Sequence, residues 1–77
     1  MAHANDYYTV GDRVQIYLDA KFWKSEGWSD GTVIRIDPYS GHRNFTWVEL
    51  DTAVRDSQGG MVSILSVLNP KHIKKME

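Results

Sequence analysis

Polar and apolar side chains alternate without a break along Arg13–Leu18, and this period of two constrains the fold more than any other feature of the chain. A period of two with β-branched residues is typical of a strand that is buried on one face only. The residues that would share the buried face are Val14, Ile16 and Leu18. No segment has the i, i+3, i+4, i+7 spacing of an amphipathic helix, so the pattern predicts an all-β chain.

Further strands follow from the same pattern and from the turn signals between them. They are expected at 31–37, 44–52, 61–67 and 73–76. The Ser, Gly and Asp content of 19–30 predicts a long first loop, which also carries Trp23 and Trp28. Pro and Gly within 38–43 predict a turn. Pro70 suits the first position of a helical turn, so a single 3-10 turn is expected before the last strand.

The composition limits both the partners and the chemistry. The 77 residues suffice for one domain, which we expect at 8–77 after a flexible tail at 1–7. Nine basic and ten acidic residues give a net charge of -1, so no overall field attracts nucleic acid or a membrane surface. Without a signal peptide or an apolar run long enough to span a membrane, we expect a cytoplasmic location.

Metal and cofactor sites are not expected from the sequence. The absence of Cys excludes disulfides, thiolate zinc sites and thiol catalysis. His3 has no second ligand at a useful spacing, and no glycine-rich motif for binding phosphate is present. We therefore predict neither a metal nor a cofactor.

Several short motifs resemble the SH3-like β-barrel superfamily. Residues 10–14 (V-G-D-R-V) are similar to its opening strand, 31–33 (G-T-V) to its second, 47–50 (W-V-E-L) to its third and 68–73 (L-N-P-K-H-I) to the turn into its last. The resemblance covers about residues 8–76. It implies a five-stranded SH3-like barrel with a long first loop and a 3-10 turn before the last strand.

Two individual families share further details. The E-type subunits of photosystem I are similar in their G-D-x-V start, in an aromatic pair in the first loop, here Phe22-Trp23, and in an acidic residue that closes the second strand, here Asp37. That family has a basic surface and an Asn-rich final loop, whereas this chain is near neutral and has Ser, Gln and Gly at 57–60. The resemblance therefore bears on layout more than on function.

The plasmid-encoded type II dihydrofolate reductases resemble the chain in length and in the G-D-R-V motif. Their V-Q-I-Y signature lies in a late strand and lines the pore of a homotetramer. Here Val14-Gln15-Ile16-Tyr17 lies in the first strand, and the late strand reads V-S-I-L at 62–65. An oligomeric reductase is thus the least favoured alternative.

Catalytic candidates are few. Histidine is the usual general base near neutral pH, and the candidates here are His42 and His72, but neither has a Ser or a carboxylate at a motif spacing. Carboxylates at the predicted strand ends favour turn capping over a paired acid–base site. These residues are Asp12, Asp30, Asp37 and Asp51. We predict no catalytic residue and no enzymatic activity.

The aromatic residues carry the functional prediction. If Thr46, Val48 and Leu50 line the core, then Phe45 and Trp47 face outward. Aromatic and Arg side chains are over-represented where proteins bind each other. The predicted binding surface comprises Trp23, Trp28, Tyr39, Arg43, Phe45 and Trp47. We expect a non-enzymatic module that binds a protein partner or itself.

Two alternatives remain open for these rings. They could cover the ends of the barrel, or they could stack on single-stranded nucleic acid with Lys24, Arg35, His42 and Arg43 beside them. The strand at 61–67 bears apolar residues on both faces, so its outer face needs a cover from the first loop, a partner or a second copy. The basic residues near the C-terminus are expected to form a solvated edge; they are Lys71, Lys74 and Lys75.

Overall fold

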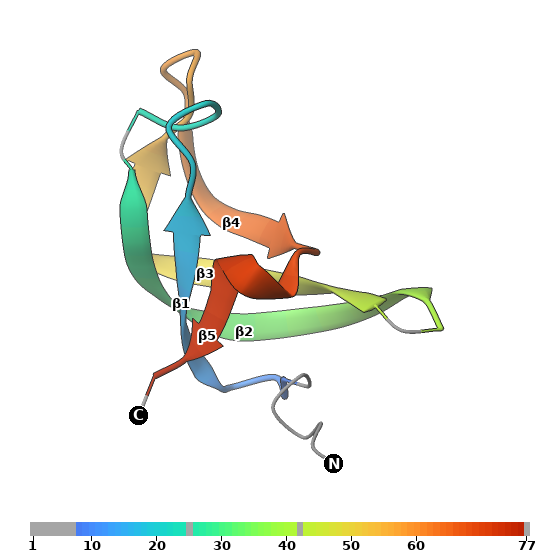
Figure 1. Cartoon of the computed structure of the whole chain (residues 1–77). Helices are drawn as coiled ribbons and strands as arrows, with labels where there is room; N and C mark the ends of the chain where they lie inside the picture. The colour runs from blue at the N-terminus through green and yellow to red at the C-terminus, as the bar shows by residue number, and fades with distance from the viewer. Residues whose placement is uncertain (1–7, 25, 42, 77) are drawn as a thin grey trace.

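The computed structural model describes residues 8–24, 26–41 and 43–76, which form one antiparallel sheet of five strands (Figure 1). The strands are β1 (Arg13–Leu18), β2 (Gly27–Ser40), β3 (Arg43–Arg55), β4 (Met61–Val67) and β5 (Ile73–Lys75). A 3-10 turn at Pro70–His72 leads into β5. The strand order β4-β3-β2-β1-β5 leaves β4 and β5 as the edges of a curved, open sheet. The described residues contain no helix that could span a membrane.

The predicted all-β class is confirmed, as are several element positions. β1 and β4 coincide with the predicted strands, and the 3-10 turn lies at the predicted place. The Asn69 side chain accepts a hydrogen bond from the backbone N–H of Lys71 and so caps this turn. β5 ends at Lys75, one residue before the predicted end. The predicted tail at 1–7 and the two histidines His3 and His42 lie outside the described residues.

β2 is longer at both ends than the sequence predicts, and this shortens the first loop to 19–26. Leu18 pairs with Gly27 and Tyr17 pairs with Trp28, so that β1 has a partner along its whole length. The prediction of loop at 27–30 was therefore wrong, because strand pairing outweighs the weak strand propensity of Gly, Ser and Asp. β3 likewise extends to 43–55, beyond the predicted 44–52.

The far end of β2 contains a proline that was expected in a turn. Pro38 instead pairs with Asn44 of β3, next to a register shift. β1 pairs with β2 only over Gly27–Thr32, so the outer side of β2 has no strand neighbour at Pro38 among the described residues. Pro is tolerated in a strand that has an open side or an irregular register, and strand structure continues to Ser40.

Aliphatic side chains from all five strands fill one face of the sheet and form the core. The buried members are Val14, Ile16, Leu18, Val33, Val48, Leu50, Val67 and Ile73. Thr46 is buried beside them. The alternation predicted for β1 and for the middle of β3 is thus confirmed. Each fully buried aliphatic side chain contributes on the order of 1.5–3 kcal/mol.

Beyond this core, β2 and β3 continue as a two-stranded ribbon, which we call the arm (residues 37–41 and 43–45). Its cross-strand pairs include Asp37 with Phe45 and Ser40 with Arg43. β4 begins to pair with β3 only at Thr46, so no described third strand pairs with the arm. In Figure 1 the arm projects away from the other strands as a long hairpin.

Candidate protein-binding surface

The face opposite the core, called the outer face here, carries the aromatic side chains of β3. Thr46 and Val48 are only 6% and 0% exposed on the core face. Phe45 and Trp47 lie on the outer face and are half-buried. The prediction that these two rings face outward is therefore confirmed.

Two aromatic rings meet on the arm. Tyr39 of β2 and Phe45 of β3 make an edge-to-face contact, with ring centroids 5.3 Å apart and planes inclined by 75°. This is a favoured geometry for aromatic pairs, because the positive edge of one ring meets the negative face of the other. Tyr39 remains 60% exposed. Arg43 is exposed at the end of the arm, two residues before Phe45 on β3.

Asp37 fixes the side chains at the base of the arm. One carboxylate oxygen accepts a hydrogen bond from Arg35 Nε at 2.9 Å, and the other accepts from Trp47 Nε1 at 3.1 Å. The carboxylate thereby orients the Trp47 indole and neutralises the Arg35 guanidinium. From the sequence, Asp37 was expected only to cap a turn. The missing information was the register between β2 and β3, which pairs Arg35 with Trp47 and Asp37 with Phe45.

A second aromatic cluster lies at the start of β2 and surrounds Trp28. The Tyr17 ring contacts the Trp28 ring edge-on at 5.6 Å, and Lys74 Nζ lies 4.3 Å from the Trp28 ring centroid. The His72 ring lies 5.8 Å from Tyr17. Tyr17 donates a hydrogen bond of 2.7 Å to Glu26, and this bond raises the pKa of the Tyr17 phenol. Trp28 is 41% exposed and belongs to β2, not to the loop in which it was expected.

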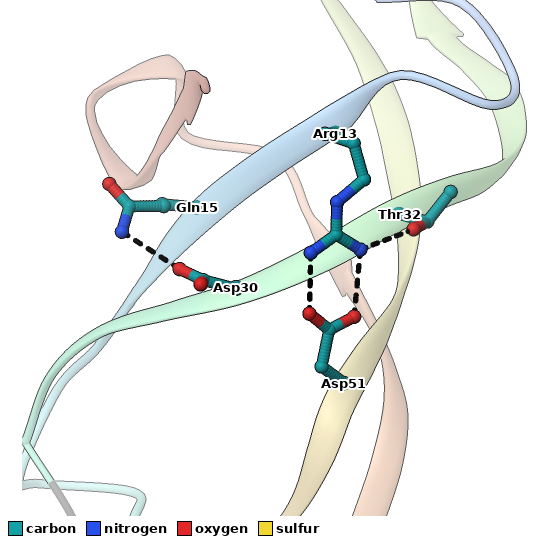
Figure 2. A network of polar contacts seen from close by, with 5 residues as sticks. All are labelled: Arg13, Gln15, Asp30, Thr32 and Asp51. Atoms are coloured by element: carbon teal, nitrogen blue, oxygen red, sulfur yellow. Dashed lines mark hydrogen bonds and ion pairs between the residues drawn. The ribbon is translucent and has the colours of Figure 1, made fainter. Parts of the chain in front are cut away.

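A polar network on β1, β2 and β3 separates the two aromatic clusters (Figure 2). Arg13 binds Asp51 through two parallel hydrogen bonds and Thr32 through a third of 2.8 Å. Gln15 donates to Asp30 at 2.8 Å. The hydrogen bond and charge of Arg13 lower the pKa of Asp51, and the same bond raises the pKa of Arg13.

These contacts correct the expectation that the four singled-out aspartates cap turns. Asp12 does so, since it accepts a hydrogen bond of 2.9 Å from the backbone N–H of Thr9. Asp30, Asp37 and Asp51 lie inside strands and bind side chains of other strands, with the Arg13–Asp51 contact reaching across β2 from β1 to β3. The longer β2 and β3 cause the difference, because they turn predicted strand ends into strand interiors.

The predicted six-residue surface is therefore divided. The arm and its base bring together Tyr39, Arg43, Phe45 and Trp47. Trp28 lies eleven residues before Tyr39 on the same strand, beyond the polar network. Trp23 packs against the core and forms an isolated bridge with Asp56, so this ring covers part of the core. One of the alternatives, a ring that closes the end of the core, thus applies to Trp23.

A broad, open hollow of about 750 Å³ lies between the start of β2 and the end of β3. Its wall combines Trp28 and Met61 with charged residues of both signs. The carboxylates of Asp30 and Asp51 in this wall are already bound to Gln15 and Arg13. Their engagement makes the hollow a weak candidate for acid–base chemistry. In the part of the chain that is described, no three His, Cys, Asp or Glu residues gather as a metal site would require.

Comparison with known proteins finds no matching family, curated protein or solved structure.

Proposed function

We propose that this chain is a small SH3-like domain without enzymatic activity, and that it binds a protein partner through the arm. The strand order supports the SH3-like assignment. Four strands follow one another as a meander, and after a 3-10 turn the fifth strand returns to pair with the first. Ile16 pairs with Ile73 at this return, so the last strand lies beside the first, while the sheet stays open between β4 and β5.

The exposed aromatic pair on the arm is the observation that carries the binding proposal. Tyr39 is 60% exposed although it lies against Phe45 and next to Pro38, in a ribbon to which no third described strand is paired. An isolated two-stranded ribbon is only marginally stable in water. A partner that covers the two rings would bury apolar area and would also stabilise the ribbon, and both effects favour binding.

The charges around the arm define the chemistry of this partner. Arg35 is neutralised by Asp37, whereas Arg43 makes no ion pair with any described residue. A guanidinium at the rim of an aromatic patch suits a carboxylate, which it can bind through two parallel hydrogen bonds. We therefore propose an apolar protein segment with an acidic side chain beside it.

Single-stranded nucleic acid is the second candidate for the same surface. The neighbouring Tyr39 and Phe45 rings, with Arg43 at their rim, resemble the stacking platforms of proteins that bind single strands. Asp37 and the exposed Glu49 oppose phosphate on the same face. The two candidates differ in salt dependence, since contacts to phosphate weaken steeply as salt rises.

Affinity capture with matched variants tests the proposal. We expect beads that carry the Tyr39→Ala variant to retain about tenfold less of at least one protein than beads that carry the wild type. The reason is that a central ring of an interface often contributes about 2 kcal/mol to binding. Phe22→Ala is the control, since Phe22 is 64% exposed in the first loop, outside the arm. Equal capture by both variants would contradict the proposal. If nuclease or moderate salt releases the bound material, the result favours the nucleic-acid candidate instead.

A further inference from the structure

The two edges of the sheet differ in the features that control strand pairing. β4 has seven residues and β5 has three, and each has a single strand neighbour. An edge strand presents backbone N–H and C=O groups that can pair with another chain. Natural sheets block such edges with lysines, prolines or very short strands.

β5 has this protection. It carries Lys74 and Lys75, which are both exposed. Lys74 reaches over the Trp28 ring, and Lys75 lies 3.6 Å from a carboxylate oxygen of Asp12. A further strand at this edge would have to displace these contacts and accept two cations beside it, so β5 is closed to strand addition.

β4 has none of these devices. Its sequence, M-V-S-I-L-S-V, contains neither a charged residue nor a proline. Ile64 is 47% exposed on the outer face, opposite in parity to the core-packed Leu65 and the buried Val67, so an apolar residue of this face is uncovered. The register shift between β3 and β4 places the extra residues in β3, because five steps from Glu49 to Val54 match two steps from Ile64 to Val62. β4 itself therefore stays extended and able to pair.

We propose that β4 pairs with β4 of a second copy of this chain, antiparallel about a two-fold axis, and joins two five-stranded sheets into one. Such a pairing is self-complementary, so every residue meets a residue of the same strand. An uncharged strand places no like charges opposite each other in this arrangement. The equivalent pairing of β5 would place lysine near lysine.

A continuous sheet keeps the outer faces of the two copies on the same side. Ile64 stands at the middle of β4, so the Ile64 side chains of both copies come together near the axis. Seven residues span about 23 Å at about 3.3 Å per residue. An interface of one strand pair is smaller than the roughly 1,000 Å² of a stable complex, so the dimer is weak and reversible. The arm takes no part in it, and the inference is independent of the proposed function.

Sedimentation equilibrium of the full chain between about 10 μM and about 1 mM tests the pairing. We expect the average mass of the wild type to rise from the monomer towards twice that value. Ile64→Lys should weaken association by about tenfold or more, because a symmetric interface contains the substitution twice. The folded monomer should tolerate this change, since Ile64 is paired with Glu49 and a lysine there faces an opposite charge.

Ile34→Lys is the matched control. Ile34 is a 37% exposed isoleucine of β2, a strand that lies inside the sheet. The Ile34→Lys variant should associate as strongly as the wild type does. Circular dichroism and thermal unfolding verify that both variants are folded. The proposal is overturned if the wild type remains monomeric throughout, or if Ile64→Lys and Ile34→Lys associate equally.

Hydrogen exchange locates the contact independently. Alternate amides of β4 should become protected as the concentration rises, whereas those of β5 should not change. Concentration-dependent protection confined to the arm would contradict pairing through β4, and would show that the aromatic pair, and not the edge, joins the two copies.

Discussion

The molecule has two parts, the arm and a packed body, by which we mean the part of the sheet that carries the core. β2 and β3 run through both parts and are stabilised differently in each. In the body, Val33 and Val48 are paired and almost completely buried. In the arm, Pro38 pairs with Asn44, and Tyr39 is 60% exposed. The same two strands are thus fully packed in the body. In the described part of the arm, the aromatic contact over the ribbon is that of Tyr39 with Phe45.

This difference shows how stability and recognition are divided in a small domain. The body contains the buried aliphatic core, and the Arg13–Asp51 network joins strands on its outer face (Figure 2). In the arm, Tyr39 keeps 60% of its surface exposed and can contact a partner. Substitutions in the body should therefore change the free energy of unfolding, and those in the arm should change binding.

The largest expected effect is that of opening the core. Ile16→Ala should lower the free energy of unfolding by about 2–5 kcal/mol, because Ile16 is fully buried and leaves a cavity. Tyr39→Ala in the arm should lower it by no more than about 1.5 kcal/mol, because the edge-to-face contact with Phe45 is what it removes. Urea unfolding monitored by circular dichroism measures both. Similar losses for the two variants would contradict the division between body and arm. If Ile16→Ala does not fold, Ile16→Val should cost about 0.5–1.5 kcal/mol.

A second prediction concerns overpacking in the body. A Cβ atom added at Gly31 would lie 2.6 Å from Val48 Cγ1 and 2.7 Å from the backbone oxygen of Glu49. Gly31→Ala should therefore lower the free energy of unfolding by about 1–3 kcal/mol. Gly41→Ala is the control, since nothing lies within 4 Å of its added Cβ. Thermal unfolding should show a lower midpoint for Gly31→Ala alone.

The boundary between body and arm depends on Asp37. Its hydrogen bond to Trp47 should contribute about 0.5–1.5 kcal/mol. A double-mutant cycle measures this contribution, with Asp37→Ala removing the acceptor and Trp47→Phe removing the donor while it keeps a smaller aromatic ring. The two substitutions should be non-additive by that amount. Additive losses would show that Asp37 does not support the base of the arm.

The smallest expected effect is that of the exposed ion pair between Arg13 and Asp51. Because the folded state holds the pKa of Asp51 below its ordinary value, its stabilisation is complete above the unfolded pKa. It is lost as pH falls through the lower, folded pKa. Asp51→Asn should therefore flatten the dependence of stability on pH below about 4. Chemical unfolding across this range, at low and high salt, checks the slope; an unchanged slope would contradict the assignment.

Local pattern was sufficient to predict much of the fold. The alternation along β1 and in the middle of β3 predicted which side chains are buried, because the pleat of a strand fixes alternate faces. Pro70 predicted the 3-10 turn. The binding surface was predicted only in part, because strand parity shows which way Phe45 points but not which ring lies beside it.

The sequence by itself determined the all-β class, the position of β1, β4 and the 3-10 turn, and the outward direction of Phe45 and Trp47. Tertiary structure decided that Gly27–Ser40 is one strand, because its weak local propensity is outweighed by pairing with β1 and β3. It also decided that Tyr39 meets Phe45 and that Trp28 meets Lys74. Such contacts join residues through the register between strands, and neither strand encodes that register alone.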